Sequence, residues 1–317
     1  MILYIFIDGI GFGNNDPEKN PFAKFAKGFF LPLANRSFPE NSPFNKAVYV
    51  KTDASMGVKG LPQSATGQSS IWTGVNCPRA LNRHVSGYPS FTLKKIIDAY
   101  SVIKIFNNHG FKSSFVNCYS PPYLDHIRKN RKFLSASTLV QMAAGLELNT
   151  FEDLMNDRGI YMDITHEFLR EYAKDFLPPE NPLLTIRDPF SVGKNLVKIS
   201  RNHDLAIYEY FITDKVGHAK DWKKAESVIY SFERFMDGIM EEISQENEQV
   251  ILTSDHGNLE DLSSGVHTIN LVPTFLYGKY TNLLKDKIHA LNDIVPAIYE
   301  IFNIDVKPSW EEVNLEI

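Results

Sequence analysis

Six acidic and histidine side chains share one placement in the sequence, because each follows an apolar run with the length of a β-strand. They are Asp8, Asp214, His218, Asp255, His256 and His267. Mixed oxygen and nitrogen donors suit zinc or manganese ions (Zn²⁺ or Mn²⁺) better than Mg²⁺ or Ca²⁺, which prefer oxygen ligands. Six ligands are too many for one tetrahedral ion with an open position, whereas two ions about 4 Å apart can share them. The set therefore predicts a centre of two divalent metal ions.

The clearest single stretch is 250–258, where a buried apolar run stops at Asp255 and His256 and a glycine then lets the backbone turn. Open α/β sheets bind ligands beyond the carboxyl ends of their strands, so the position suits a metal site. Taken alone, the pair could equally cap the next helix. The other candidate ligands in the chain favour a metal site over a helix cap.

A candidate nucleophile, Thr66, lies in the stretch 61–74. Small hydroxyl residues ahead of an apolar stretch predict a helix N-terminus, where unpaired N–H groups and the helix dipole favour an anion. Gly67 could offer such an N–H group. Taken alone, Thr66 is more simply an ordinary helix cap, but beside a metal pair it would be ionised and aimed at phosphorus.

Three further residues follow the helix that would carry Thr66. They are Asn82, Arg83 and His84, whose side chains could contact the free oxygens of a bound phosphate. Lys215 lies between two of the candidate ligands, although a solvated lysine is the simpler interpretation.

The elements that must position these side chains alternate as in α/β proteins. Strands are predicted at 2–7, 47–52, 111–117, 205–212, 249–254 and 272–278, and helices at 92–109, 190–201, 222–246 and 289–302. The helix at 222–246 connects two of the strands as a βαβ unit. Residues 119–189 contain polar helical stretches but no strong strand, so we interpret them as a small insertion or cap within one domain spanning 1–317.

Composition excludes several classes of protein. The 317 residues are 43% hydrophobic, which is ample for a core, and the net charge of -5 without a basic tract argues against nucleic-acid binding. Cys77 and Cys118 are too few for a disulfide framework. The apolar start 1–7 has no basic leader and is too short for a membrane span, so a cytoplasmic protein is expected. Gly9, Gly11 and Gly13 do not open a helix, which excludes a dinucleotide fingerprint.

The order of the motifs resembles that of the alkaline phosphatase superfamily, in the branch of cofactor-independent phosphoglycerate mutase, phosphopentomutase and nucleotide pyrophosphatase/phosphodiesterases. The matching motifs are Asp8-Gly9, Ser64-Ala65-Thr66-Gly67-Gln68, Asp214-Lys215-Val216-Gly217-His218, Ser254-Asp255-His256-Gly257-Asn258 and His267. The resemblance covers the core at both ends of the chain and omits 119–189. It implies a three-layer α/β sandwich with a mostly parallel central sheet.

The resemblance also implies a division of the site. Asp8, Thr66, Asp255 and His256 would bind the metal that activates the nucleophile, and Asp214, His218 and His267 would bind the second. Thr66 would attack a phosphate ester to give a phosphothreonine that water hydrolyses. Threonine departs here from the serine of phosphoglycerate mutase and alkaline phosphatase. Cys77-Pro78-Arg79 lacks the spacer of the sulfatase motif, which argues against a sulfatase.

We therefore predict a two-metal hydrolase of small phosphomonoesters or phosphodiesters, with no membrane or nucleic-acid partner. One alternative is a phosphomutase acting on a small phosphorylated sugar or glycerate. Mutases reorient their substrate under a sizeable cap, and the short 119–189 segment favours hydrolysis. The other alternative is a non-catalytic metal-binding descendant. The substrate, the physiological metal and the oligomeric state are not specified by any motif.

Overall fold

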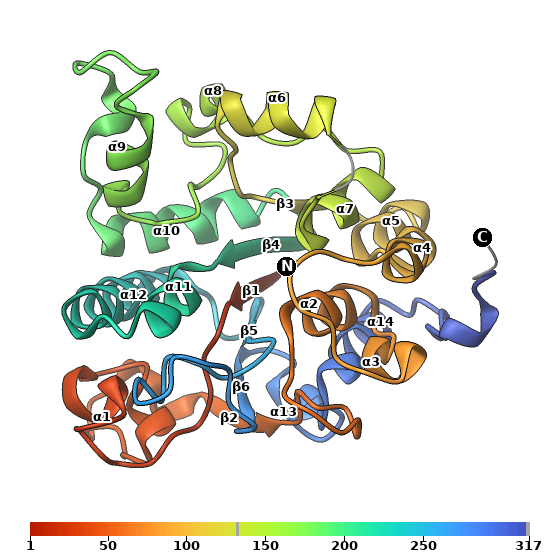
Figure 1. The fold of residues 1–317 in the computed structure, drawn as a ribbon, viewed down its shortest axis with the longest axis horizontal. Coiled ribbons are helices and arrows are strands. Elements are labelled where there is room, and N and C mark those ends of the chain that lie inside the picture. The colour runs from red at the N-terminus through yellow and green to blue at the C-terminus, as the bar shows by residue number, and fades with distance from the viewer. Residues whose placement is uncertain (131–132, 315–317) are drawn as a thin grey trace.

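A mixed six-stranded sheet forms the centre of the protein in this computed structural model, which describes residues 1–130 and 133–314 (Figure 1). The strands are β1 (Ile2–Ile7), β2 (Val48–Thr52), β3 (Ser113–Phe115), β4 (Leu205–Tyr210), β5 (Gln249–Thr253) and β6 (Val272–Gly278). Their order is β2-β6-β5-β1-β4-β3. β1 pairs in parallel with β4 and β5, and β3 with β4, whereas β6 runs antiparallel to β5 and β2. The prediction of a mostly parallel sheet is confirmed.

A layer of helices covers each face of the sheet, and β1 is therefore buried on both faces. Leu3, Ile5 and Ile7 of β1 pack toward one layer, and the alternate side chains pack toward the other. The first layer contains α1 (Pro21–Phe25), α10 (Pro189–Ser200) and α12 (Trp222–Glu242). The second contains α2 (Ser64–Thr73), α4 (Phe91–Tyr100), α5 (Val102–Asn108), α7 (Ala136–Ala143) and α14 (Ile294–Ile301). The three layers are visible edge-on in Figure 1.

Shorter elements complete the chain. The remaining helices are α3 (Cys77–Leu81), α6 (Pro121–Lys129), α8 (Phe151–Met155), α9 (Glu167–Ala173), α11 (Ile212–Ala219) and α13 (Thr281–Lys285). Short 3₁₀ helices occupy Leu31–Ala34, Pro43–Lys46, Pro182–Leu184, Leu291–Asp293 and Trp310–Glu312. None of the helices in residues 1–130 and 133–314 is both long enough and apolar enough to cross a bilayer.

Two predicted elements have different boundaries in the structure, for local reasons. The helix predicted at 92–109 is divided into α4 and α5 at Ser101, whose side chain caps α5 by accepting from the N–H of Lys104. The strand predicted at 205–212 ends at Tyr210, and α11 begins at Ile212. Asp214 and His218 are therefore one helical turn apart on α11 and not in a loop after the strand.

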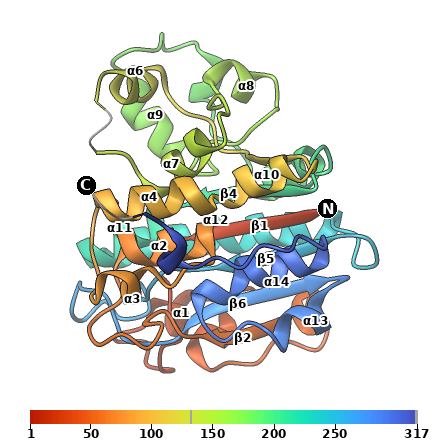
Figure 2. The same ribbon diagram turned by 90° about the vertical axis from the view of Figure 1, so that its right-hand side faces the viewer.

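The segment 119–189 is more helical than its sequence suggests. α6, α8 and α9 lie above the rest of the chain in both views (Figures 1 and 2). Part of the segment has a hydrophobic cluster of its own, formed by Cys118, Phe151, Leu154, Tyr161, Leu169, Ala173 and Leu183. α7 differs, because it packs against α2, α4 and α5 in the main body. We refer to 119–189 without α7 as the cap segment.

Candidate functional site

Two groups of three side chains gather where β1, β4 and β5 end. The first cluster is Asp8, Asp255 and His256, and the second cluster is Asp214, His218 and His267. In each cluster, one ligand atom from every residue lies within 4.8 Å of those from the other two. The structure thus brings together all six metal-ligand candidates that follow strands in the sequence.

The first cluster is buried, and several of its polar atoms lack hydrogen-bond partners. His256 Nε2 lies 3.4 Å from both Asp8 Oδ1 and Asp255 Oδ2. Asp8 Oδ1 and Asp255 Oδ1 are buried without a hydrogen-bond partner. Burial raises the pKa of Asp8 well above its usual value and that of Asp255 to about 7. Repulsion from neighbouring carboxylates is the second cause of both shifts. Burial and the neighbouring His267 lower the pKa of His256 to about 3. A bound cation would offset the cost of burying these carboxylates.

The second cluster is arranged to accept a cation as well. Nδ1 of His218 lies 3.0 Å from the carbonyl oxygen of Gly265, and Nδ1 of His267 lies 3.0 Å from that of Pro62. Each Nδ1–H therefore donates to a carbonyl, which leaves each Nε2 as an acceptor. The two Nε2 atoms are nevertheless only 3.2 Å apart. Two facing acceptors repel each other unless a cation lies beside them, so the donor set fits a divalent metal.

The two clusters are adjacent. The rings of His256 and His267 stack at a centroid distance of 3.5 Å. Asn258, which follows β5, donates through Nδ2 to Asp214 Oδ1 at 2.6 Å and so ties the two clusters together. Asp214 also contributes to raising the pKa of both Asp8 and Asp255. This proximity is what a pair of cooperating metal ions requires.

Glycine is required where β1 meets α11. Gly9 has a φ of +71°, and a Cβ atom at this position would lie 2.8 Å from Asp214 Oδ1. Any larger residue would be strained and would push Asp214 away. The close approach of Asp8 and Asp214 therefore depends on Gly9.

Thr66, our predicted nucleophile and metal ligand, is not directed toward either cluster. Its hydroxyl donates to the carbonyl oxygen of Gln63 at 3.1 Å and accepts from the N–H of Val85 at 3.2 Å. The side chain is fully buried, and Thr66 does not line the cavity described below. We therefore correct the prediction that Thr66 is the nucleophile. Its hydroxyl instead connects the loop at Val85 to the start of α2 through hydrogen bonds.

The hydroxyl that does face the first cluster belongs to Ser64, the first residue of α2. Ser64 Oγ lies 3.0 Å from His256 Nε2. Gln68, one turn later, donates through Nε2 to Asp255 Oδ2 at 3.1 Å and to Asp8 Oδ2 at 3.4 Å. Residues four apart share a helix face, whereas Thr66 is about 200° around the axis from Ser64. The spacing of Ser64 and Gln68 was the signal that could have identified both.

The remaining predicted substrate contacts also lie elsewhere. Asn82 and Arg83 are exposed, and Nε2 of His84 lies 3.1 Å from the carbonyl oxygen of Val58. These three residues are not among the described residues that line the cavity. The N–H of Gly67 donates to Gln63 O inside α2, so it is not available to an anion.

A cavity of about 730 Å³ opens onto the clusters. The main body contributes Asp8, Ser64, Gln68, Asp214 and Lys215 to its lining. The cap segment contributes aromatic side chains from its loops and helices, namely Tyr119, Tyr123, Phe133, Tyr161, Phe168 and Tyr172. A small organic molecule can therefore contact both the clusters and the cap segment at once.

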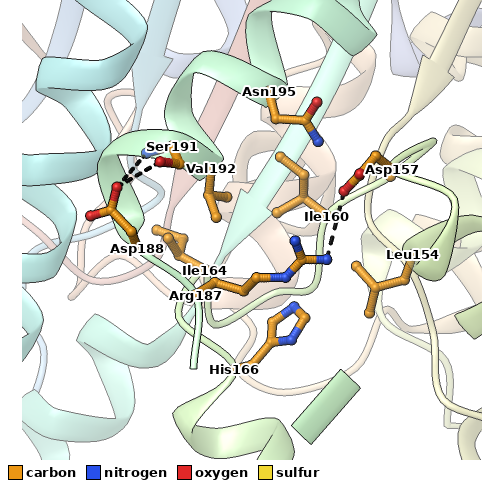
Figure 3. Close-up of a pocket in the computed structure, with 11 residues that line it drawn as sticks. Leu154, Asp157, Ile160, Ile164, His166, Arg187, Asp188, Ser191, Val192 and Asn195 are labelled. Carbon is orange, nitrogen blue, oxygen red and sulfur yellow. Dashed lines mark hydrogen bonds and ion pairs between the residues drawn. The ribbon is translucent and has the colours of Figure 1, made fainter. Parts of the chain in front are cut away.

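A second, smaller cavity of about 230 Å³ has different walls (Figure 3). Arg187 lies in it beside His166, and its guanidinium is 3.6 Å from Asp157 Oδ1. His166 Nδ1 lies 2.9 Å from the carbonyl oxygen of Leu183. This cavity shares no lining residue with the larger one, among the residues that the structure describes. The 730 Å³ cavity is the candidate active site, because Asp8 and Asp214 of the two clusters line it.

We expect Gly67→Ala to destabilise the protein by about 1–3 kcal/mol, because overpacking strains a tight contact. A Cβ atom at Gly67 would lie 2.9 Å from Asp255 Cβ and 3.0 Å from the Asp255 carbonyl oxygen. Urea denaturation would measure the loss. Gly28→Ala is the matched control, since its nearest neighbour would be 3.7 Å away. Equal stability of the two variants would show that α2 and Asp255 are not in close contact.

Family and sequence comparisons match part of this chain to known metalloenzymes and mutases. A family model described as the Metalloenzyme superfamily matches residues 191–306. The 2,3-bisphosphoglycerate-independent phosphoglycerate mutase of Ehrlichia ruminantium (strain Gardel) is 32% identical over 146 residues. That alignment covers 44% of this chain and 28% of the relative. The chain thus matches little more than a quarter of the relative's length.

Solved structures resemble the chain over almost its whole length. Alkaline phosphatase from the Antarctic bacterium TAB5 has a TM-score of 0.55 and 16% identity, and the match covers 96% of this chain and 98% of that one. The PH0037 protein from Pyrococcus horikoshii has a TM-score of 0.55 and 12% identity, with the same coverage. At these identities the likeness shows a shared fold.

Proposed function

We propose that the chain belongs to the alkaline phosphatase superfamily of metalloenzymes and cleaves a small phosphate ester through Ser64, with two divalent ions held by the two clusters. The observation that carries this proposal is the position of Ser64 Oγ, 3.0 Å from His256 Nε2 at the start of α2. In our proposal Ser64 replaces Thr66 as the nucleophile. With Ser64 as the nucleophile, the chain no longer departs from the serine of phosphoglycerate mutase and alkaline phosphatase.

The residues of this chain divide the chemistry between them. Asp8, Asp255 and His256 would hold one ion, and the second cluster would hold the other. Bound Zn²⁺ or Mn²⁺ would lower the pKa of the serine hydroxyl and neutralise the phosphoryl oxygens. Ser64 Oγ attacks phosphorus as the bond to the leaving alcohol breaks, and water later releases the phosphate from the serine.

Two further groups orient the phosphate. The N-terminus of α2 directs its dipole toward an anion held at Ser64. Lys215 lines the same cavity, and its ammonium, whose pKa is lowered by desolvation, can face the phosphate oxygens. Gln68 fixes the two carboxylates of the first cluster through its amide.

A phosphomutase is the second candidate, and two observations favour it. The curated relative in Ehrlichia ruminantium is named as a mutase, although the match covers only part of each chain. The described residues of the cap segment form three α-helices and a 3₁₀ helix and line the cavity, so the expectation of a weakly structured insertion no longer favours hydrolysis. We further propose that 1–317 is one domain in which the cap segment covers the substrate.

The two candidates predict different products. With Zn²⁺ or Mn²⁺, we expect p-nitrophenol release from p-nitrophenyl phosphate or its bis-ester, as for a hydrolase with an activated serine. With 3-phosphoglycerate, a hydrolase releases inorganic phosphate, whereas a mutase forms 2-phosphoglycerate without free phosphate. Phosphorus NMR would separate these products. Failure to turn over any ester, together with no metal in elemental analysis, would favour a non-catalytic protein.

A further inference from the structure

A single carboxylate faces the cavity from the carboxyl end of β4. Glu209 is the second-last residue of that strand and lines the same cavity as Ser64. Its backbone is held on both sides by Asn117, which donates to Glu209 O at 2.8 Å and accepts from Glu209 N–H at 2.8 Å. The direction of the side chain is therefore determined by the sheet and not by a mobile loop.

Glu209 has little compensation for its charge. Burial raises its pKa to about 7, and the hydroxyl of Ser137 is a partner that stabilises the charged form. In residues 1–130 and 133–314, no ion pair of the protein includes Glu209. A carboxylate in such a place gains most from a ligand that brings a positive charge.

The walls around Glu209 are aromatic and held in place. Tyr119 and Tyr123 stack at 5.3 Å, and their hydroxyls already bond to Gln141 and Thr138, each at 2.8 Å. Tyr119 accepts from Gln141, and Tyr123 shares a hydrogen bond with Thr138, so both rings are held in place at the cavity wall. Aromatic faces attract cations through their negative quadrupole.

The cavity already holds one cation in this manner. Nζ of Lys215 lies 4.7 Å from the ring centroid of Phe168 and 5.0 Å from that of Phe211. Both rings line the cavity. Lys215 lines the cavity together with its sequence neighbour Asp214, a member of the second cluster.

We propose that Glu209 and the aromatic walls select phosphate esters whose alcohol carries a positively charged nitrogen, with the nitrogen against Glu209 and the phosphate at the clusters. This inference rests on the proposed function, because it names the substrate class of that site. Glu209 lines the same cavity as Asp8 and Asp214, so one small molecule can place its nitrogen against Glu209 and its phosphate at the clusters. An alcohol bearing a carboxylate, as in a glycerate, would instead meet a like charge.

The test compares choline phosphate with its uncharged isostere, 3,3-dimethylbutyl phosphate, on the metal-loaded full chain. We expect kcat/KM to favour choline phosphate by about tenfold or more, as for a charge-assisted and cation–π contact. In Glu209→Gln the ratio of the two kcat/KM values should fall by about threefold or more, and the preference that remains is the contribution of the rings. A merely structural loss would lower both values equally and leave the ratio unchanged.

Glu171→Gln is the matched control, because Glu171 is exposed on α9 of the same cap segment. It should retain the full preference. Equal use of the two esters by the unmodified protein, an unchanged ratio in Glu209→Gln, or a preference for 3-phosphoglycerate would each overturn the inference. In those cases turnover of p-nitrophenyl phosphate would still support the proposed function.

Failure of the proposed function can also be distinguished from failure of this inference. If no ester is turned over, the proposed function fails, and calorimetric titration of the metal-loaded protein then tests the inference alone. Choline phosphate should bind about tenfold more tightly than its isostere, and Glu209→Gln should reduce the difference by about threefold or more. Equal dissociation constants for the two compounds would overturn the inference.

Discussion

Replacing Ser64 with alanine is expected to reduce phosphate-ester turnover by about 10⁴-fold or more, the effect of removing a nucleophile. Ser64 Oγ is the hydroxyl that lies 3.0 Å from His256 Nε2 and lines the cavity. Steady-state kinetics with p-nitrophenyl phosphate would measure the loss. Acid quenching followed by peptide mass spectrometry should place the trapped phosphate on Ser64.

Thr66→Val is the matched control for this experiment. It removes a buried hydroxyl two residues away that bonds to Gln63 O and Val85 N. We expect it to cost about 1–3 kcal/mol of stability, since Val85 N–H loses its acceptor, while turnover stays within about tenfold of the unmodified protein. The reverse pattern, with phosphate on Thr66 and an active Ser64→Ala, would restore our original prediction from the sequence.

Removing metal is expected to abolish turnover and to lower the melting temperature. Asp8 and Asp255 are buried beside each other with unpartnered oxygens, so bound cations stabilise the folded state relative to the unfolded chain. Chelation with EDTA, followed by addition of Zn²⁺ or Mn²⁺, would test this by differential scanning fluorimetry and activity. Identical melting curves with and without metal at about pH 8 would contradict it.

The stabilisation by metal should increase with pH. The pKa of Asp255 is raised to about 7, so without metal its contribution to stability is present below about pH 4 and is lost as pH rises through about 7. Below about pH 7 the metal must displace the proton that Asp255 holds. The difference in melting temperature between metal-loaded and chelated protein should therefore grow from about pH 5 to about pH 8.

Asp255→Asn separates the two effects of this carboxylate. The variant removes a buried charge, so the chelated protein should be at least as stable at about pH 8 as the chelated unmodified protein. The same variant should lose most of its stabilisation by metal, because the first cluster loses a charged ligand. A variant that still gained full stability from metal would show that Asp255 is not a ligand.

The positions of the six metal-ligand candidates could be predicted because strand ends are legible in a sequence. Apolar runs predicted β1, β4 and β5 to within two residues, and parallel strands bring their carboxyl ends to one edge of the sheet. Donors that follow such runs must then lie near one another. The fold class followed from the same runs, although the antiparallel direction of β6 did not.

The choice between Ser64 and Thr66 needed the start of α2. Composition indicates a helix N-terminus within the stretch 61–74, but a shift of two residues rotates a side chain by about 200°. In the structure α2 begins at Ser64, and the N–H of Val85 donates to the Thr66 hydroxyl, which is buried. Ser64 and Gln68 are then the pair that faces the first cluster.

The sequence by itself determined which donors the strands deliver and in what order, because local apolar patterns specify strands and their ends. Only the tertiary structure decided which hydroxyl meets those donors and what surrounds the substrate. Glu209 and the rings of Tyr119 and Phe168 are far apart along the chain and line one cavity through packing of the cap segment. Such long-range contacts leave no periodic pattern in the sequence, so neither the cavity nor its proposed preference for a cation could be derived from it.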